Sequence, residues 1–163
     1  MPTGGLILRQ PDEADASVVC GWSLSAQETT QWCASKTHPV TASQVVEWWL
    51  PSDVEPFVAV SGNLAPLAYG ELWLEAEEDE VELARLIVAP RMRGRGVGRQ
   101  LVAALVDKGA LTGLSTVILR VTPGNDAALH CYRDSGFREL DERRNAEWNK
   151  GQPATYTWME LAR

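Results

Sequence analysis

Two hydropathy patterns divide the 163 residues into expected strands and expected helices. Between residues 69 and 75, aromatic and acidic side chains alternate with Gly and Leu, which is the period of a half-buried strand. From Val97 the period lengthens, so that Val97, Leu101, Ala104 and Leu105 fall on one helical face. The patterns predict strands at 6–9, 81–88, 115–121 and 155–161, a hairpin within 57–76 that turns near Gly62 and Asn63, and helices from 11 to about Leu24, at 25–36, at 41–50, from 97 to 109 or 113, and at 126–135.

Signals for helix ends support several of these boundaries. Thr41 and Gln44 form a capping-box pattern ahead of apolar positions, and Pro51 stops the helix that follows. Asn125 is a good N-cap, and Gly136 ends the helix after it. No repeat, low-complexity tract or linker interrupts this order, and the length suits one core. We therefore expect a single domain over residues 1–163.

Charge and cysteine content exclude several classes of function. The chain carries 15 Lys and Arg against 22 Asp and Glu, a net charge of −7, so its surface as a whole should repel nucleic acid and anionic membranes. Its three cysteines have no paired spacing, which favours free thiols in a reducing cytosol. The first residues lack a signal-peptide pattern, and no apolar run is long enough to span a bilayer. We expect a cytoplasmic protein with no nucleic-acid or membrane partner.

The segment PRMRGRGVGRQL, residues 90–101, is a local exception to this acidic character, with four arginines and three glycines between an expected strand and an expected helix. That order aims backbone N–H groups and a helix N-terminus at one small volume, which favours an anion and above all a diphosphate. A Rossmann fingerprint would need glycine at Arg99, and a Walker loop would need Gly-Lys followed by Ser or Thr. A solvated turn and an Arg-rich nucleic-acid patch remain as alternatives.

Two motifs, taken together, resemble those of the GNAT superfamily of N-acetyltransferases. RGRGVG at 93–98 matches the RxxGxG signature of that family, and VELARLIVAP before it is similar to the family's fourth strand. NDAALHCYRDSGF, from Asn125, is similar to the second signature, and STVILRV lies between the motifs where the fifth strand belongs. The resemblance implies an α/β (α+β) fold with one GNAT-like domain: a mixed, mostly antiparallel twisted sheet of six or seven strands, helices on both faces, and a splayed central cleft.

The resemblance also implies acetyl-CoA, or another short acyl-CoA, as cofactor. Its pyrophosphate would bind backbone N–H groups of the glycine stretch, and its pantetheine arm would pair like an extra strand where the fourth and fifth strands part. The implied cofactor-binding residues are Leu86, Ile87, Val88, Arg93, Gly94, Arg95, Gly96, Val97, Gly98 and Asn125. No metal site is expected, since His38 and His130 lack metal-ligand spacing.

The implied reaction is acetyl transfer to a primary amine by direct attack of the amine on the thioester. Glu82, at the family's glutamate position and expected on the same side of its strand as Leu86 and Val88, would be the base that deprotonates the amine. Glu71 and a chain of waters are the alternatives. The backbone N–H of Val88 would hold the oxyanion, and Tyr132 would protonate the leaving thiolate.

The motifs do not identify the amine acceptor, and they are compatible with more than one function. The acidic run from Glu75 to Glu80 could draw a cationic acceptor such as a polyamine, an aminoglycoside, a lysine or a protein N-terminus. Trp22, Trp32, Trp48 and Trp49 fall in the helices that line the acceptor cleft of the family, where we expect an aromatic wall. A non-catalytic acyl-CoA-binding or sensing module is the alternative function. A homodimer is compatible with the resemblance.

Overall fold

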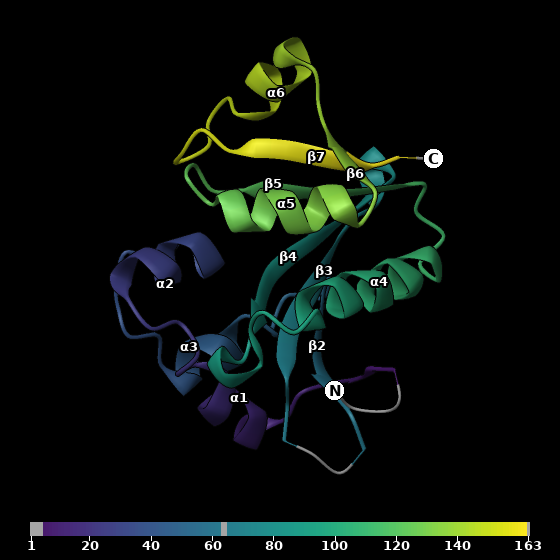
Figure 1. The fold of residues 1–163 in the computed structure, drawn as a ribbon. Coiled ribbons are helices and arrows are strands. Elements are labelled where there is room, and N and C mark those ends of the chain that lie inside the picture. Colours follow the sequence, from purple (N-terminus) through teal and green to yellow (C-terminus); the bar gives the residue numbers. More distant parts are fainter. Residues whose placement is uncertain (1–4, 63–64, 163) are drawn as a thin grey trace.

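A seven-stranded sheet forms the centre of the fold in the computed structural model, which describes residues 5–62 and 65–162 (Figure 1). Its strands are β1 (Ile7–Arg9), β2 (Val54–Val60), β3 (Ala68–Glu75), β4 (Glu80–Val88), β5 (Thr116–Val121), β6 (Phe137–Glu139) and β7 (Thr157–Leu161). Across the sheet they follow the order β1-β2-β3-β4-β5-β7-β6. All neighbours are antiparallel except β4 and β5, which run parallel. The predicted mixed, mostly antiparallel sheet is confirmed.

Helices cover both faces of this sheet (Figure 1). They are α1 (Glu13–Val19), α2 (Ala26–Cys33), α3 (Ala42–Glu47), α4 (Val97–Ala110), α5 (Asp126–Asp134) and α6 (Glu142–Trp148), with short 3-10 turns at Ala76–Glu78 and Pro90–Met92. On one face α4 packs against β3 and β4, and α5 packs beside α4 and β6. On the other face, side chains of α1, α2 and α3 bury Val58, Tyr69 and Ile87 of the central strands.

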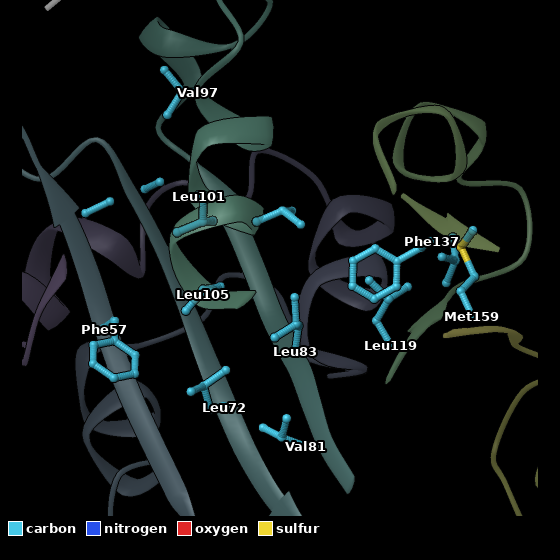
Figure 2. Packing of buried hydrophobic residues seen from close by; sticks show 14 of the residues in the cluster. Phe57, Leu72, Val81, Leu83, Val97, Leu101, Leu105, Leu119, Phe137 and Met159 are labelled. Atoms are coloured by element: carbon cyan, nitrogen blue, oxygen red, sulfur yellow. The ribbon is translucent and has the colours of Figure 1, made fainter. Parts of the chain in front are cut away.

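The helix α4 supplies much of the main core. Val97, Leu101 and Leu105, spaced by four residues, lie on the side of α4 that faces the strands carrying Leu72 and Leu83 (Figure 2). The side chains of Val97, Leu101 and Leu105 are each at most 1% exposed. Burial of such a side chain contributes roughly 1.5–3 kcal/mol. This packing fixes the start of α4, and therefore the glycine stretch before it, against the sheet.

Side-chain caps define where several helices begin. Asp12 accepts from the Asp15 N–H and Asp15 accepts from the Asp12 N–H, which forms a capping box at the start of α1. The capping box predicted from Thr41 and Gln44 is confirmed at the start of α3. The predicted N-cap role of Asn125 at α5 is confirmed as well.

A β-bulge interrupts β4 at Arg85. The backbone of this residue has a φ of 51°, in the left-handed region. The pairing with β3 changes register across it, from Tyr69↔Ile87 to Glu71↔Ala84, so that β4 has one extra residue there. A bulge of this kind bends the strand and changes the edge to which its later residues point their peptide groups.

The bulge also reverses the alternation of side chains along β4. Leu83 and Leu86 are three residues apart, yet both pack into the α4 core together with Val88. Glu82, next to Leu83, therefore lies on the opposite face of the sheet from Leu86 and Val88. The prediction that these three side chains share one side is wrong, because it assumed an unbroken strand.

The parallel pair β4 and β5 separates along its length. Cα partners are present only at Glu80↔Thr116, Val81↔Val117 and Glu82↔Ile118. Beyond these pairs β5 continues in register with β7, while β4 runs on toward the start of α4, and the two strands diverge (Figure 1). The predicted splay at the centre of the sheet is confirmed.

Several boundaries and elements differ from the sequence-based expectation. The strand β6 and the helix α6 were not predicted; the sequence ERRNAEW of α6 offers no apolar stripe, and the helix instead begins at the capping carboxylate of Asp141. The first helix ends at Val19 rather than near Leu24, because a turn there carries Trp22 into the buried cluster that includes Val58, Tyr69 and Ile87, which we call the second core cluster. In the predicted hairpin turn, Gly62 has a φ of 60°, and Asn63 lies outside the described residues.

Candidate active site

The separation of β4 and β5 opens a cleft with a volume of about 530 Å³. Its walls come from both strands, from α2, from the start of α4 and from α5. Strand β4 contributes residues 82–88, and the loop before α4 contributes Arg93, Gly94 and Gly96. The cleft thus joins the open edge of the sheet to the glycine stretch.

The backbone N–H of Val88 lies on the edge of β4 that faces this cleft. The N–H of Ala89 donates to Leu67 O at 2.9 Å, so Ala89 directs its peptide groups toward the neighbouring strand β3. Successive residues of a strand direct these groups to opposite edges. Val88 therefore directs its N–H toward β5, which is no longer paired with β4 at this level. The Val88 N–H thus points into the gap between β4 and β5.

The same register separates Leu86 from Ile87. Ile87 is the partner of Tyr69 in β3, two residues before the hydrogen bond of Ala89, so its peptide groups serve the β3 pairing. Leu86 precedes Val88 by two residues and shares its open edge. Of the three β4 residues expected to pair with a cofactor arm, Leu86 and Val88 direct their N–H groups to the open edge, where the Val88 carbonyl accepts from Arg93 Nε at 3.2 Å, while Ile87 contributes to the wall of the cleft.

The loop ahead of α4 depends on two glycine conformations. Gly94 and Gly96 have φ values of 76° and 80°, which L side chains rarely adopt. Gly96 is the N-cap of α4, and no side chain caps this helix. The N–H groups of its first turn, at residues 97–99, consequently have no partner within the helix. Together with the positive end of the helix dipole they form a site suited to a phosphate.

Most arginine side chains of this stretch bind protein groups rather than pointing into open space. Arg93 donates from Nη1 to Glu28 Oε1 at 2.9 Å and from Nη2 to Trp22 O at 2.8 Å, which ties the loop to the N-terminal helices. Arg99 forms an ion pair with a carboxylate of α5. Arg95 is exposed and has no hydrogen bond or ion pair within residues 5–62 and 65–162. Its charge remains available to a ligand.

Glu82 lies at the root of the cleft in a bidentate ion pair. Arg120 donates from Nε to Oε2 at 2.8 Å and from Nη2 to Oε1 at 2.9 Å, and Glu82 is 1% exposed. Arg120 Nη1 donates to Gln152 Oε1 at 3.0 Å. The guanidinium also lies against the rings of Trp73, Tyr156 and Trp158, with centroids 5.6, 5.3 and 4.5 Å away. Each oxygen of Glu82 keeps a second lone pair, so the carboxylate can still accept from a ligand or water.

Glu71, the alternative base, is buried behind the wall of the cleft. It is 0% exposed and is not among the residues that line the cleft. Its oxygens accept from Trp73 Nε1 at 2.8 Å, from Arg85 Nη1 at 2.9 Å and from the hydroxyl of Tyr69. Burial raises the pKa of the Glu71 carboxyl. These contacts make it a support for the wall, out of reach of a ligand in the cleft.

Tyr132 projects from α5 into the lining of the cleft. Its ring packs edge to face on Phe137, with centroids 6.3 Å apart. The hydroxyl makes no hydrogen bond within the described part of the chain, and burial raises the pKa of the phenol. Asn125, at the start of the same helix, also lines the cleft and uses its Oδ1 to cap the Ala128 N–H. An unbonded O–H at the wall suits a proton donor.

Several side chains that line the cleft were not predicted from the sequence, among them Trp73, Arg85, Arg120 and Tyr156. A signal for two of them was present. Arg85 and Arg120 each have apolar neighbours on both sides in an expected strand, in LARLIV and VILRV, where a charged side chain needs a partner. Of the four tryptophans expected to form an aromatic wall, Trp32 lines the cleft. The other three pack within the second core cluster.

The acidic run does not reach the cleft. Residues 75–80 lie at the turn between β3 and β4, and none of them is among the lining residues that the structure describes. Within the same described ranges, no group of three or more His, Cys, Asp or Glu side chains is placed to hold a metal ion. No helix of residues 5–62 or 65–162 combines the length and apolar content that a membrane span requires.

Comparison with known proteins identifies both the sequence family and the fold. The family model described as Acetyltransferase (GNAT) family matches residues 24–137. The [ribosomal protein bS18]-alanine N-acetyltransferase of Salmonella typhimurium is 39% identical over 67 residues, which are 41% of this chain and 45% of that protein. The streptothricin acetyltransferase of Streptomyces lavendulae is 31% identical over 86 residues, 53% of this chain and 46% of that protein. The matches thus span about half the length of these curated relatives.

Solved structures agree with the fold over nearly the whole chain. AAC(6')-Ib in complex with Parmomycin and acetyl-CoA has a TM-score of 0.75 at 21% identity, covering 98% of this chain and 94% of that one. Spermidine N-acetyltransferase from Vibrio cholerae, solved with CoA and spermine, has a TM-score of 0.75 at 18% identity, covering 96% and 95%. At these identities the likeness establishes the fold alone.

Proposed function

Because the chain belongs to the acetyltransferase (GNAT) family, we propose that it is an N-acetyltransferase that moves an acetyl group from acetyl-CoA to a primary amine. The observation that carries the proposal is the split of the sheet, where the free N–H of Val88 lies beside an uncapped helix N-terminus. Residues 1–163 form one such domain in this proposal. The substrates named for relatives and neighbours support amine acetylation as a class.

The residues of the cleft fit a CoA thioester, which when bound supplies the activated acyl group. The N–H groups at 97–99 suit a diphosphate because they converge at the positive end of α4. Gly94 and Gly96 have no Cβ, so a ligand can approach the backbone closely. Leu86 offers its strand-edge backbone groups and Val88 its N–H to an extended chain that carries amides. Arg95 adds an exposed positive charge.

Val88 and Tyr132 act on the acyl group and on the leaving thiolate. When the amine nitrogen attacks the thioester carbonyl, an N–C bond forms and the carbonyl oxygen becomes an oxyanion. The Val88 N–H stabilises that charge. When the C–S bond breaks, the Tyr132 hydroxyl donates its proton to the thiolate. The phenolate then recovers a proton from solvent.

Glu82 receives the proton that the acceptor must lose. A primary amine is mostly protonated near neutral pH and has to give up a proton before it can attack. Glu82 lines the cleft, and Arg120 fixes its carboxylate in one orientation. A water between the amine and the carboxylate lets Glu82 act as base while its pair with Arg120 stays intact. The alternative in which water chains alone carry the proton predicts that Glu82→Gln has little effect.

The experiment combines CoA calorimetry with a thiol-release assay on a panel of amines. Wild type is expected to bind CoA and to release thiol with at least one amine. Tyr132→Phe should keep CoA binding and lower kcat by about 100-fold, the usual range for loss of a general acid. Tyr156→Phe makes the same change at another residue that lines the cleft and should lower kcat far less.

Two results would count against the enzyme assignment in different ways. No heat with CoA at concentrations up to about 1 mM would remove the cofactor site itself. CoA binding without thiol release on any amine would favour the non-catalytic acyl-CoA-binding module. An unchanged kcat in Tyr132→Phe would leave the enzyme but reject this residue as the acid.

A further inference from the structure

Arg85 presents a rigid guanidinium to the cleft. The bulge at this residue turns the strand, and the side chain lines the cleft with 21% of its surface exposed. Its Nη1 donates to Glu71 Oε1 at 2.9 Å. Its Cζ lies 4.3 Å from the ring centroid of Trp48 and 5.0 Å from that of Trp73. The guanidinium is therefore held by a buried carboxylate and by contacts with two indole rings.

Most of the donors of this guanidinium have no protein partner. An arginine carries five N–H donors, and the bond to Glu71 is the one hydrogen bond that Arg85 donates within the described residues. The other arginines that line the cleft differ. Arg93 and Arg120 each use Nε, Nη1 and Nη2 in bonds to protein oxygens. Arg85 is thus the lining cation in the described ranges with a free edge for a ligand.

Carboxylates in the same wall are already paired. Glu28 accepts from Arg93, and Glu82 accepts from Nε and Nη2 of Arg120. The acidic run at 75–80 lies outside the lining. An acceptor with several ammonium groups would find no unpaired carboxylate here to hold its second charge. The chemistry of the wall favours a ligand that accepts hydrogen bonds over a polycation.

We propose that Arg85 binds an anionic oxoacid group of the acceptor, so that the acceptor is a small primary amine that also carries a carboxylate or a related oxoanion. This deepens the proposed function and rests on it. A planar guanidinium with two adjacent N–H groups matches a carboxylate in bidentate geometry. Trp32 and Trp73, which line the same wall, would contact the apolar part of the molecule. An amino acid has this combination of groups.

The pair with Glu71 is compatible with a second anion on Arg85. A guanidinium can bind two carboxylates along different edges, and Glu71 uses Nη1 alone. Glu71 also accepts from Tyr69 and Trp73, so its charge is spread over three donors.

The test compares matched pairs of amines in the thiol-release assay. Glycine, β-alanine and γ-aminobutyrate vary the distance between amine and carboxylate, and the carboxamide of each removes the charge. An aminoalkyl phosphonate separates carboxylate from other oxoanions, and spermidine represents polycations. At least one oxoanion should exceed its uncharged analogue in kcat/KM by about 10- to 100-fold, the value of a charge-assisted bidentate pair. Equal kcat/KM values for acid and amide, or a preference for spermidine, would overturn the proposal.

Variants assign the preference to Arg85. Arg85→Lys keeps the charge but lacks the planar fork, and should raise KM for the oxoanion while kcat changes less. The double variant Glu71→Gln/Arg85→Gln removes the buried charge together with its partner, which protects folding, and should abolish the acid-over-amide preference. Arg138→Gln, an exposed arginine of β6, is the control that keeps it. A preference that survives in the double variant would assign it elsewhere and overturn the role of Arg85.

A binding measurement distinguishes failure of the oxoanion site from failure of the proposed acetyltransferase activity. Calorimetry with N-acetylated forms of the same amino acids needs no turnover. Binding to wild type and loss of binding in the double variant would support the oxoanion site even if no amine were acetylated. Absence of binding to wild type, with CoA present, would overturn the oxoanion site while leaving the CoA site intact.

Discussion

Replacing Arg120 by Met should destabilise the protein strongly, because the Glu82 carboxylate would be buried without its cation. Glu82 is 1% exposed, and both of its oxygens accept from Arg120, at 2.8 and 2.9 Å. Met keeps most of the apolar length of the arginine and fills irregular space well. The substitution therefore removes the charge and the donors, including the bond to Gln152, with little loss of volume.

The expected cost follows from the contacts of this pair. Removal of one partner of a buried ion pair costs about 3–5 kcal/mol. The Arg120 side chain is 24% exposed, so some water reaches the site, and we expect the lower end of that range, about 3 kcal/mol. Loss of the contacts with three aromatic rings adds about 0.5–1 kcal/mol. In Glu82→Gln/Arg120→Met no unpaired charge remains, so about 1–2 kcal/mol of the loss should return.

Urea unfolding at pH 7 measures these differences. With an m-value of about 2 kcal/mol/M, a total loss of about 3.5–4 kcal/mol lowers the midpoint by about 1.8–2 M. Arg138→Met is the matched control, since that arginine is 69% exposed and lies 3.8 Å from Glu160. An exposed pair of this kind contributes at most about 1 kcal/mol. A double-mutant cycle over Glu82 and Arg120 then isolates their interaction.

Two outcomes would refute this reasoning. A loss below about 1 kcal/mol in Arg120→Met would mean that water or another donor satisfies Glu82 without the arginine. A double variant no more stable than Arg120→Met would mean that the arginine acts through packing alone. In either case the carboxylate would not be fixed by Arg120, and the orientation assigned to the base would lose its support.

Three further predictions concern the glycine stretch and the far edge of the sheet. Gly96→Ala should lower the free energy of unfolding by about 1–2 kcal/mol and weaken CoA binding in calorimetry. Nothing lies within 4 Å of the added Cβ, but a φ of 80° is strained for alanine. An unchanged affinity for CoA would contradict this prediction. Arg95→Ala should weaken CoA binding by less than about tenfold, with a loss that shrinks as salt is raised, as expected of an exposed charge. The hydrogen bonds from Arg144 lower the pKa of Glu160. This pair therefore stabilises the fold fully above the ordinary glutamate pKa of about 4.3, and the contribution is lost as the pH falls from there through the lowered pKa of the folded state. Arg144→Gln should accordingly reduce stability in urea at pH 7 by at most about 1 kcal/mol and have less effect at pH 3.

The elements with strong periodicity or clear caps could be predicted from the sequence. Val97, Leu101 and Leu105 repeat at helical spacing and form the buried side of α4. Thr41 and Asn125 carry their caps locally, so their helices begin where the sequence indicates. The helix α6 has no apolar stripe of its own and depends on contacts with β7, which are invisible in a local pattern.

The site was predictable where it rests on backbone and not where it rests on distant side chains. The glycines at 94 and 96 indicate an anion-binding loop because their conformational freedom is a local property. The pair of Glu82 with Arg120 joins residues 38 apart in the chain, and no local rule connects them. The sequence ELARLIV likewise gives no indication of the bulge at Arg85, although this bulge decides which side chains of β4 share a face.

The strained conformation of Arg85 gives a last prediction, since it links the bulge to the acceptor side of the cleft. A non-glycine residue at a φ of 51° is strained by about 1–2 kcal/mol. The bond from Trp32 Nε1 to Arg85 O at 2.8 Å and the pair with Glu71 hold the residue there. Arg85→Ala and Arg85→Gly lose the side-chain contacts equally, but glycine also relieves the strain. We expect Arg85→Gly to be the more stable of the two by about 1 kcal/mol.

In an ordinary strand the order of stability is the opposite, with alanine more stable than glycine, and this provides a control. Glycine inside an ordinary strand is less stable than alanine by roughly 0.5–1 kcal/mol, because it loses more backbone freedom on folding. Arg138 in β6 has no positive φ, so Arg138→Gly should be less stable there than Arg138→Ala. If the same order were found at Arg85, the bulge would be unstrained. The free edge that Leu86 and Val88 offer would then follow from the register alone, with no contribution from the contacts that hold Arg85.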